Sequence, residues 1–313
     1  MEEKPKIIVI AGPTASGKTS LAIELALAIG GEIVNADSMQ VYRGMDVGTA
    51  KPDSHERSSV PHHLMDVVDP DEDFNAALYR SLALPVIRGI LSRGRVPFVV
   101  GGTGLYIRVL LGGVVPSPPI DPKLRRGLQD EIARKGPASF HERLKELDPE
   151  SARRIHPHDR VRILRALEII YLSKKRLSAL VENHRFKDNP FNALKICLQI
   201  EREQLYHRIN ERCVRMIESG LAAETASLLK KGYSPALKSM TGLGYRHMVG
   251  VLEGRWDMDA ALRKLQSETR RYAKRQMTWF RADPENIWVR PGDVEGISRR
   301  IREFLGEGEA VKP

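Results

Sequence analysis

A short run near the N-terminus has the residue types needed to hold phosphate groups. Residues 12–19 fit the pattern G-x-x-x-x-G-K-[ST] at every specified position. Backbone N–H groups in such a loop, and at the start of the helix that follows it, favour an anion. The loop also supplies a lysine charge and a hydroxyl that can bind Mg²⁺. We therefore expect a phosphate or diphosphate to be bound by Gly12, Pro13, Thr14, Ala15, Ser16, Gly17, Lys18 and Thr19.

A carboxylate follows the second predicted strand, at Asp37. An Asp at a strand tip beside a phosphate loop can act as a general base or hold Mg²⁺ through water. It can also simply cap a turn or helix, which is a common role of an Asp-Ser pair. Ser38, Met39 and Gln40 place two hydrogen-bonding side chains around a flexible apolar one. This segment is therefore suited to holding a flat base.

Two further turns carry polar residues. In residues 101–104, Thr103 can hydrogen-bond a ligand in the same crevice, although glycine-rich turns often serve only backbone geometry. His62 and His63 are adjacent, and adjacent side chains on a strand point to opposite faces. We expect a structural or electrostatic role for these histidines rather than a metal site.

Basic residues recur at helical spacing in two predicted helices. In residues 159–165, Asp159 is the expected cap, and Arg162 and Arg165 share one face. That face can be a solvated surface or a nucleic-acid contact. The other face is expected to be apolar, with Val161, Leu164 and Leu167. Arg212 lies on a second basic face with Arg208 and Arg215, which suits a diphosphate.

Strands and helices alternate in the first part of the chain, which predicts an α/β fold with a parallel sheet and helices on both faces. The expected strands are residues 7–10, 32–35, 64–68 and 97–100, with a helix over 75–93 and later strands at 194–200 and 287–289. The proline-rich tract 114–122 marks a boundary. We predict a P-loop NTPase-like core of residues 1–121 and 191–313, interrupted by an inserted, mostly α-helical domain of residues 122–190.

Composition narrows the classes of protein. The 313 residues are 42% hydrophobic and 29% charged, and they include no apolar run long enough to span a bilayer. The two cysteines have no metal spacing, and no signal peptide precedes the first strand. We expect a cytoplasmic protein that is not associated with a membrane. The net charge is +10, and residues 122–190 hold 17 Lys and Arg against 10 Asp and Glu, which favours a polyanionic partner.

Several segments together resemble the bacterial tRNA dimethylallyltransferases, the isopentenyl transferases of tRNA. They occur in family order across nearly the whole chain, and their joint occurrence is far more specific than the phosphate loop alone. The chain resembles the short bacterial form, without the zinc-finger pattern of eukaryotic relatives, so no structural zinc is expected. The matching segments are residues 12–19, 37–44, 48–52, 101–106, 156–168, 244–246 and 274–276.

The resemblance implies transfer of a dimethylallyl group from dimethylallyl diphosphate to N6 of adenosine 37, just 3′ of the anticodon, in tRNAs reading codons that begin with U. It implies Mg²⁺ at Thr19, a monomer, and tRNA as partner. Lys18 and Arg212 match positions at the diphosphate, Asp37 matches the expected base, and Thr103 lies beside the reacting groups. The residues expected to contact tRNA are Asp37, Ser38, Met39, Gln40, Thr103, Arg125, Val161, Arg162, Ile163, Leu164 and Arg165.

Three other functions remain open on sequence alone. The phosphate loop is most often a nucleotide site that binds ATP, so a nucleotide or small-molecule kinase is one alternative. However, no apolar run ending in Asp-Glu, typical of ATP-hydrolysing motors, is present. An adenylate isopentenyltransferase would prenylate free AMP, against which the long basic insertion argues. A regulator that binds RNA without catalysis is the third alternative.

Overall fold

The computed structural model describes residues 3–184 and 187–306. The chain divides into two compact units, one of residues 1–111 and 190–313 and the other of residues 112–189. Among the described residues, none of the helices combines the length and the apolar character that a bilayer crossing requires.

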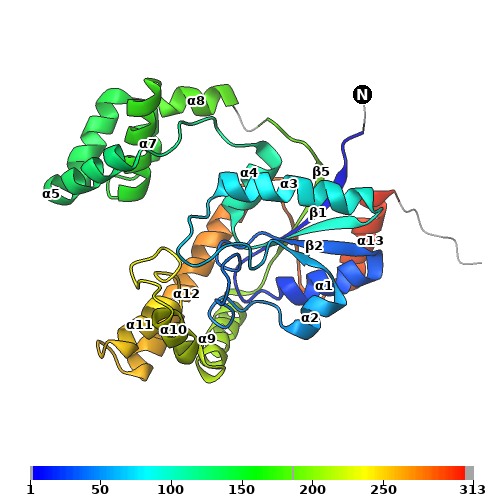
Figure 1. Ribbon diagram of the computed structural model, residues 1–313. Helices are drawn as coiled ribbons and strands as arrows, with labels where there is room; N and C mark the ends of the chain where they lie inside the picture. The colour runs from blue at the N-terminus through cyan, green and yellow to red at the C-terminus, as the bar shows by residue number, and fades with distance from the viewer. Residues whose placement is uncertain (1–2, 185–186, 307–313) are drawn as a thin grey trace, which may run out of the picture. The chain divides into compact units, whose positions relative to one another are not determined.

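The first unit is built on a six-stranded sheet in which every neighbouring pair is parallel (Figure 1). Its spatial order is β3 (His62–His63), β2 (Gly31–Asn35), β4 (Val96–Gly101), β1 (Lys6–Ala11), β5 (Asn192–Leu198) and β6 (Ile287–Val289). This confirms the predicted parallel α/β core. Ala11, the last residue of β1, lies opposite Gly101 of β4. The loops that follow these strands therefore emerge side by side at one edge of the sheet, where ligands of such sheets collect.

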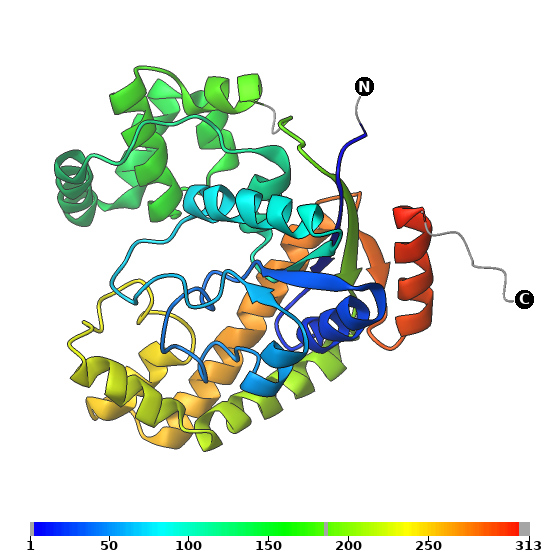
Figure 2. The same ribbon diagram turned by 45° about the vertical axis from the view of Figure 1, so that its right-hand side comes forward.

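Side chains of the central strand alternate between two buried layers. Ile8 and Ile10 pack with α1 (Lys18–Ile29) and α13 (Val294–Leu305) on one face. Figure 2 shows both helices on the same side of the sheet. Ile7 and Val9 face the opposite layer, which includes α3 (Ala76–Ser92), α4 (Gly104–Gly112), α9 (Arg202–Glu218) and α12 (Met258–Arg281). Burial on both faces explains why this strand reads as an uninterrupted apolar run. The remaining helices of this unit are α2 (Ser54–Ser59), α10 (Leu221–Lys230) and α11 (Tyr245–Leu252).

The prediction of a strand at residues 64–68 is wrong. Leu64 and Asp66 have φ angles of +62° and +54°, which an extended strand does not accommodate. The strand is instead the two-residue β3 just before them, and Val68 makes a single bridge with Tyr42. The helix expected over residues 75–93 is confirmed as α3, whose first turn is capped by the Asn75 side chain.

The second unit is helical, with α5 (Pro122–Leu147), α6 (Pro149–Arg154), α7 (Arg160–Ser173) and α8 (Leu177–His184). Asp159 caps α7 as expected, accepting from the N–H of Arg162 at 3.0 Å. The unit begins at Gly112, before the expected position 122. Within this unit, Arg165 Nη2 on α7 donates to Ser117 Oγ at 3.0 Å, which ties the proline-rich tract to that helix.

Candidate active site

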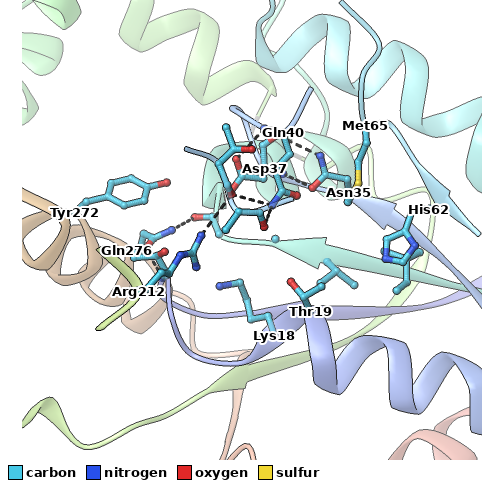
Figure 3. A pocket seen from close by; sticks show the side chains of 17 residues that line it. Lys18, Thr19, Asn35, Asp37, Gln40, His62, Met65, Arg212, Tyr272 and Gln276 are labelled. Carbon is cyan, nitrogen blue, oxygen red and sulfur yellow. Dashed lines mark hydrogen bonds between the residues drawn. The ribbon is translucent and has the colours of Figure 1, made fainter. Parts of the chain in front are cut away.

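Loops at the carboxyl ends of the strands enclose a polar pocket in the first unit (Figure 3). The pocket occupies ≈ 610 Å³ including its open mouth. Side chains from the starts of helices, from loops and from α9 and α12 converge on it. Its polar lining includes Thr14, Lys18, Thr19, Asn35, Asp37, Gln40, Thr49, His62, Arg212, Tyr272 and Gln276. The structure thus brings six predicted site residues, from distant parts of the chain, into one pocket: Thr14, Lys18, Thr19, Asp37, Gln40 and Arg212.

The phosphate loop, residues 12–19, has a backbone that few sequences permit. Gly12 and Gly17 have φ angles of +148° and +86°, and Ala15 has +62°. This left-handed region is inexpensive only for glycine, so the two glycines are needed for the path of the loop. Gly17 precedes α1 without a side-chain cap hydrogen bond, so the first N–H groups of that helix are available to an anion.

Two cations share this pocket with one carboxylate. The Nζ of Lys18 donates to the carbonyl of Pro13 at 2.6 Å. Burial, and then the Arg212 guanidinium, lower the pKa of Lys18 from 10.5 to about 8, whereas the Asp37 carboxylate opposes this shift. Burial likewise lowers the pKa of Arg212, again against Asp37. An anion bound here would relieve the repulsion between the two cations and favour the protonated form of Lys18.

Asp37 is held in one orientation by neighbouring backbone. Its Oδ1 accepts from the N–H of Met39 at 2.8 Å, and its own N–H donates to Asn35 Oδ1 at 3.1 Å. The capping role considered for this residue is therefore present. One oxygen caps a turn, while the charge of the carboxylate acts on Lys18 and Arg212 across the pocket.

Thr103 is pressed against the segment that carries Asp37. Its Oγ1 accepts from the N–H of Ser38 at 3.0 Å. A side chain on Gly101 would place its Cβ 2.2 Å from the carbonyl oxygen of Ala36, so this close approach needs glycine. Burial raises the pKa of Tyr272, and the neighbouring Asp37 charge adds to that rise while the Thr103 hydroxyl opposes it.

The segment expected to hold a base is fixed by internal contacts. Gln40 Nε2 donates to the carbonyl oxygens of Thr49 and Ala50, both at 3.2 Å. Arg212 Nη2 reaches the same Thr49 oxygen at 3.4 Å. Met39 lies so close to Gly242 that a Cβ there would be 2.6 Å from its methyl carbon. The amide nitrogen of Gln40 is therefore engaged by the chain itself.

Glu224 of α10 fixes the loop that carries Thr49. Its carboxylate accepts from the N–H groups of Asp46, Val47 and Gly48 at 2.9, 2.8 and 3.1 Å, and from the Tyr245 hydroxyl at 2.6 Å. Sequence analysis did not single out Glu224. No local pattern could have found it, because its backbone partners lie 176–178 positions away in the chain and Tyr245 lies 21 positions away.

Gln276 of α12 joins two other loops. Its Oε1 accepts from the N–H of Thr14 at 2.8 Å, and its Nε2 donates to the carbonyl of Gly102 at 2.9 Å. The sequence places Gln276 in a segment that resembles the family, but gives it no role. Its helical spacing from the apolar residues Ala273 and Phe280, on the face of α12 that is buried, is the signal that could have drawn attention.

The second unit separates the residues expected to contact tRNA into three groups. Val161 and the Arg162 side chain face solvent, with 79% and 67% exposure, so the expected place of Val161 on an apolar face is wrong. Arg125 and Arg165 pair with Glu168 of α7, whose side chain is 1% exposed. The other two expected residues, Ile163 and Leu164, belong to the core of the unit.

The two adjacent histidines have separate structural partners. His62 Nδ1 hydrogen-bonds with the Val60 carbonyl, and His63 Nε2 contacts Glu32, each at 2.7 Å. Over residues 3–184 and 187–306, no group of three or more His, Cys, Asp or Glu side chains could hold a metal ion.

Similarity to known sequences extends over almost all of the chain. The IPP transferase family model matches residues 40–283, and an isopentenyl transferase model matches residues 5–66. The tRNA dimethylallyltransferase of Geobacter sulfurreducens is 51% identical over 304 residues, which cover 97% of this chain and 98% of that protein.

Solved structures extend the likeness to the fold. The tRNA isopentenylpyrophosphate transferase of Staphylococcus epidermidis is 38% identical, with a TM-score of 0.70 over 97% of this chain and all of that one. A eukaryotic dimethylallyltransferase, captured acting on tRNA, is 28% identical, with a TM-score of 0.81 over 98% of this chain and 81% of that one. The parallel sheet and its helices are therefore a shared architecture.

Proposed function

The chain belongs to the IPP transferase family, and on that premise we propose that it transfers the dimethylallyl group of dimethylallyl diphosphate to tRNA. The acceptor is N6 of the adenosine immediately 3′ of the anticodon, position 37, in tRNAs that read codons beginning with U. The observation that carries the proposal is that Lys18, Arg212 and Asp37 line one pocket. Two cations suit a departing diphosphate, and a carboxylate suits an amine that must lose a proton.

The phosphate loop stabilises the leaving group. As the allylic C–O bond breaks, its electron pair and the negative charge pass to the diphosphate. The uncapped start of α1, Lys18 and Arg212 are already in place to receive that charge. Because these donors are fixed before the reaction, they need no reorganisation as the bond breaks.

Asp37 accepts the proton that the adenine amine loses. The N6 lone pair is delocalised into the ring, so the amine is a poor nucleophile until a base assists it. The new N–C bond forms from that lone pair, and the N–H proton passes to the Asp37 carboxylate and later to solvent. The adenine must leave its stack to reach the pocket. Gln40 is part of the pocket lining, and Ser38, Met39 and Thr103 would border the base beside it.

Thr19 is the residue that would hold Mg²⁺. The ion favours hard oxygen ligands and commonly combines one or two protein oxygens with substrate phosphates and water. Thr19 offers a hydroxyl in the pocket, beside Lys18. This hydroxyl fits the ion, which when bound would neutralise negative charge on the diphosphate.

The second unit supplies contacts with tRNA through its basic surface. Arg162 is the most exposed of its expected arginines, and Val161 lies next to it on α7. Contacts to the RNA backbone release counterions, so affinity should fall as salt rises. We also propose that the protein acts as a monomer in the cytoplasm.

The test is incubation of the protein with unmodified tRNA and labelled dimethylallyl diphosphate, with and without Mg²⁺. We expect label at adenosine 37, and transfer that depends on the ion. Parallel reactions contain AMP in place of tRNA, or ATP in place of the prenyl donor. Absence of label in RNA under every condition would refute the proposal, as would AMP labelled as efficiently as tRNA.

A further inference from the structure

We propose that Gln276 is a positioning residue that sets the spacing between the phosphate loop and the acceptor side of the pocket, defined as Asp37 with Thr103. The proposal rests on the function proposed above. Gln276 is 6% exposed, and its amide spans the gap between two loops that emerge from adjacent strands. It touches the phosphate loop at Thr14 and the glycine-rich turn at Gly102.

The chemistry of its partners fixes the orientation of the amide. The Thr14 backbone offers an N–H, which needs an acceptor, and the Gly102 carbonyl needs a donor. Rotating the amide of Gln276 by half a turn would set like groups against each other at both ends. A primary amide is therefore matched to this position, whereas an apolar side chain would leave both backbone groups without their partner.

The two loops carry opposite halves of the reaction. The phosphate loop leads into Lys18 and Thr19 at the start of α1. The Gly102 turn leads into Thr103, whose Oγ1 holds the backbone next to Asp37. Gln276 thus links the loop that leads to Lys18, which receives the diphosphate charge, with the turn that leads to Thr103, which holds the segment of the proton acceptor Asp37.

The close approach of Gly102 to Gln276 offers a second way to disturb this bridge. A Cβ on Gly102 would lie 2.3 Å from Gln276 Nε2, whereas its next contacts, at 3.4 and 3.5 Å, are ordinary ones. Gly102 has no left-handed φ that would penalise alanine. Gly102→Ala should therefore act mainly by displacing the amide of Gln276.

Spacing matters because displacement of the diphosphate needs the amine and the leaving group in line. A misplacement of about 1 Å can cost on the order of 10²-fold in rate. We expect Gln276→Met, which keeps side-chain length and removes both hydrogen bonds, to lower the single-turnover rate by about 10- to 100-fold. The Kd for pyrophosphate and the Kd for tRNA should change far less.

Gln266→Met is the matched control on the same helix. Gln266 donates to the Asn210 carbonyl at 3.4 Å and contacts neither loop, so its substitution should leave the rate unchanged. A rate for Gln276→Met equal to wild type would overturn the proposal. So would a loss accounted for entirely by weaker pyrophosphate binding.

Two further experiments keep the proposal testable if Gln276→Met folds poorly. In a double-mutant cycle, Gly102→Ala should slow the wild type but cost little more in a Gln276→Ala background; additive losses would contradict the bridge. In Gln276→Glu, a protonated carboxyl can both accept and donate, as the amide does. Its rate relative to wild type should therefore rise from pH 8 to pH 6, and a flat ratio would contradict the proposal.

Wild-type protein in each assay distinguishes a failure of the proposed function from a failure of the positioning role of Gln276. No transfer by wild type would refute the proposed function. Transfer by wild type with unaffected Gln276 variants would refute the positioning role alone.

Discussion

Positive charge is arranged differently in the pocket of the first unit and on helices α5 and α7 of the second. In the pocket, Lys18 and Arg212 are crowded together, and their pKa values are lowered by burial. On the helices, Arg125 and Arg165 keep about a third of their side chains in solvent and share one buried partner, Glu168. The buried cations of the pocket lose free energy of hydration, whereas the arginines on the helices remain partly hydrated.

This difference matches what each ligand requires. A reacting diphosphate needs donors whose atoms stay fixed while charge develops. An RNA backbone offers repeated phosphates, so recognition tolerates side chains that move. Substitutions in the pocket should accordingly change rate, and substitutions on the helices should change stability or affinity.

The largest effect is expected at Asp37. Asp37→Asn keeps an oxygen that can accept from the Met39 N–H, but it removes the proton acceptor. We expect the single-turnover rate to fall by about 10²- to 10⁴-fold, with tRNA binding retained. Quench-flow transfer and filter binding measure the two quantities. Full activity of this variant would remove Asp37 as the base.

Lys18→Met should come next, with a loss in transfer rate of about 10²- to 10³-fold. It also gives a pH signature. The pKa of Lys18 is lowered to about 8, and a bound diphosphate stabilises the ammonium and raises that pKa. Binding must then take up a proton near pH 8, so affinity should fall as pH rises through this value.

Calorimetry with pyrophosphate, in buffers of different ionisation enthalpy, measures this proton uptake. Pyrophosphate has its own titration, which Lys18→Met shares with wild type. The difference between the two proteins therefore isolates Lys18. Equal proton uptake by both would show that the lysine does not titrate on binding.

Glu168→Gln tests the second unit. The variant removes the charge that Arg125 and Arg165 share, and it should lower the free energy of unfolding by about 1.5–3 kcal/mol. The arginines can rehydrate, so the loss stays below that for a fully buried pair. Urea unfolding measures it, with Glu150→Gln in an exposed ion pair as control. A fall in kcat at saturating tRNA, without a loss of stability, would contradict the comparison.

The smallest effect is expected at Arg162. Arg162→Ala should weaken tRNA binding a few-fold and reduce the slope of log affinity against log salt by about 0.7–0.9, with kcat unchanged. Arg154→Ala is the control, since its side chain is equally exposed, at 67%, in the same unit. Equal changes in both variants would indicate general charge rather than a contact at Arg162.

Local patterns predicted the parts of the site that are contiguous in sequence. The phosphate loop, the Asp37 turn and the Asp159 cap each depend on neighbours a few residues away. The strand expected at 64–68 failed because two left-handed residues interrupt an apolar run, and composition does not reveal backbone angles. The bridge from Gln276 to Thr14 spans 262 positions, so it exists only once the chain is folded.

The carboxylate of Glu224 has a consequence for how the molecule meets a phosphate-rich solution. Three successive N–H groups, of residues 46–48, form a concavity of the kind that captures free anions. Here the Glu224 carboxylate of the chain itself is the anion that occupies this concavity. A tethered carboxylate outcompetes dissolved phosphate by its local concentration. The carboxylate therefore occupies the three N–H donors that a dissolved phosphate would otherwise find, next to the Thr49 carbonyl that Arg212 contacts.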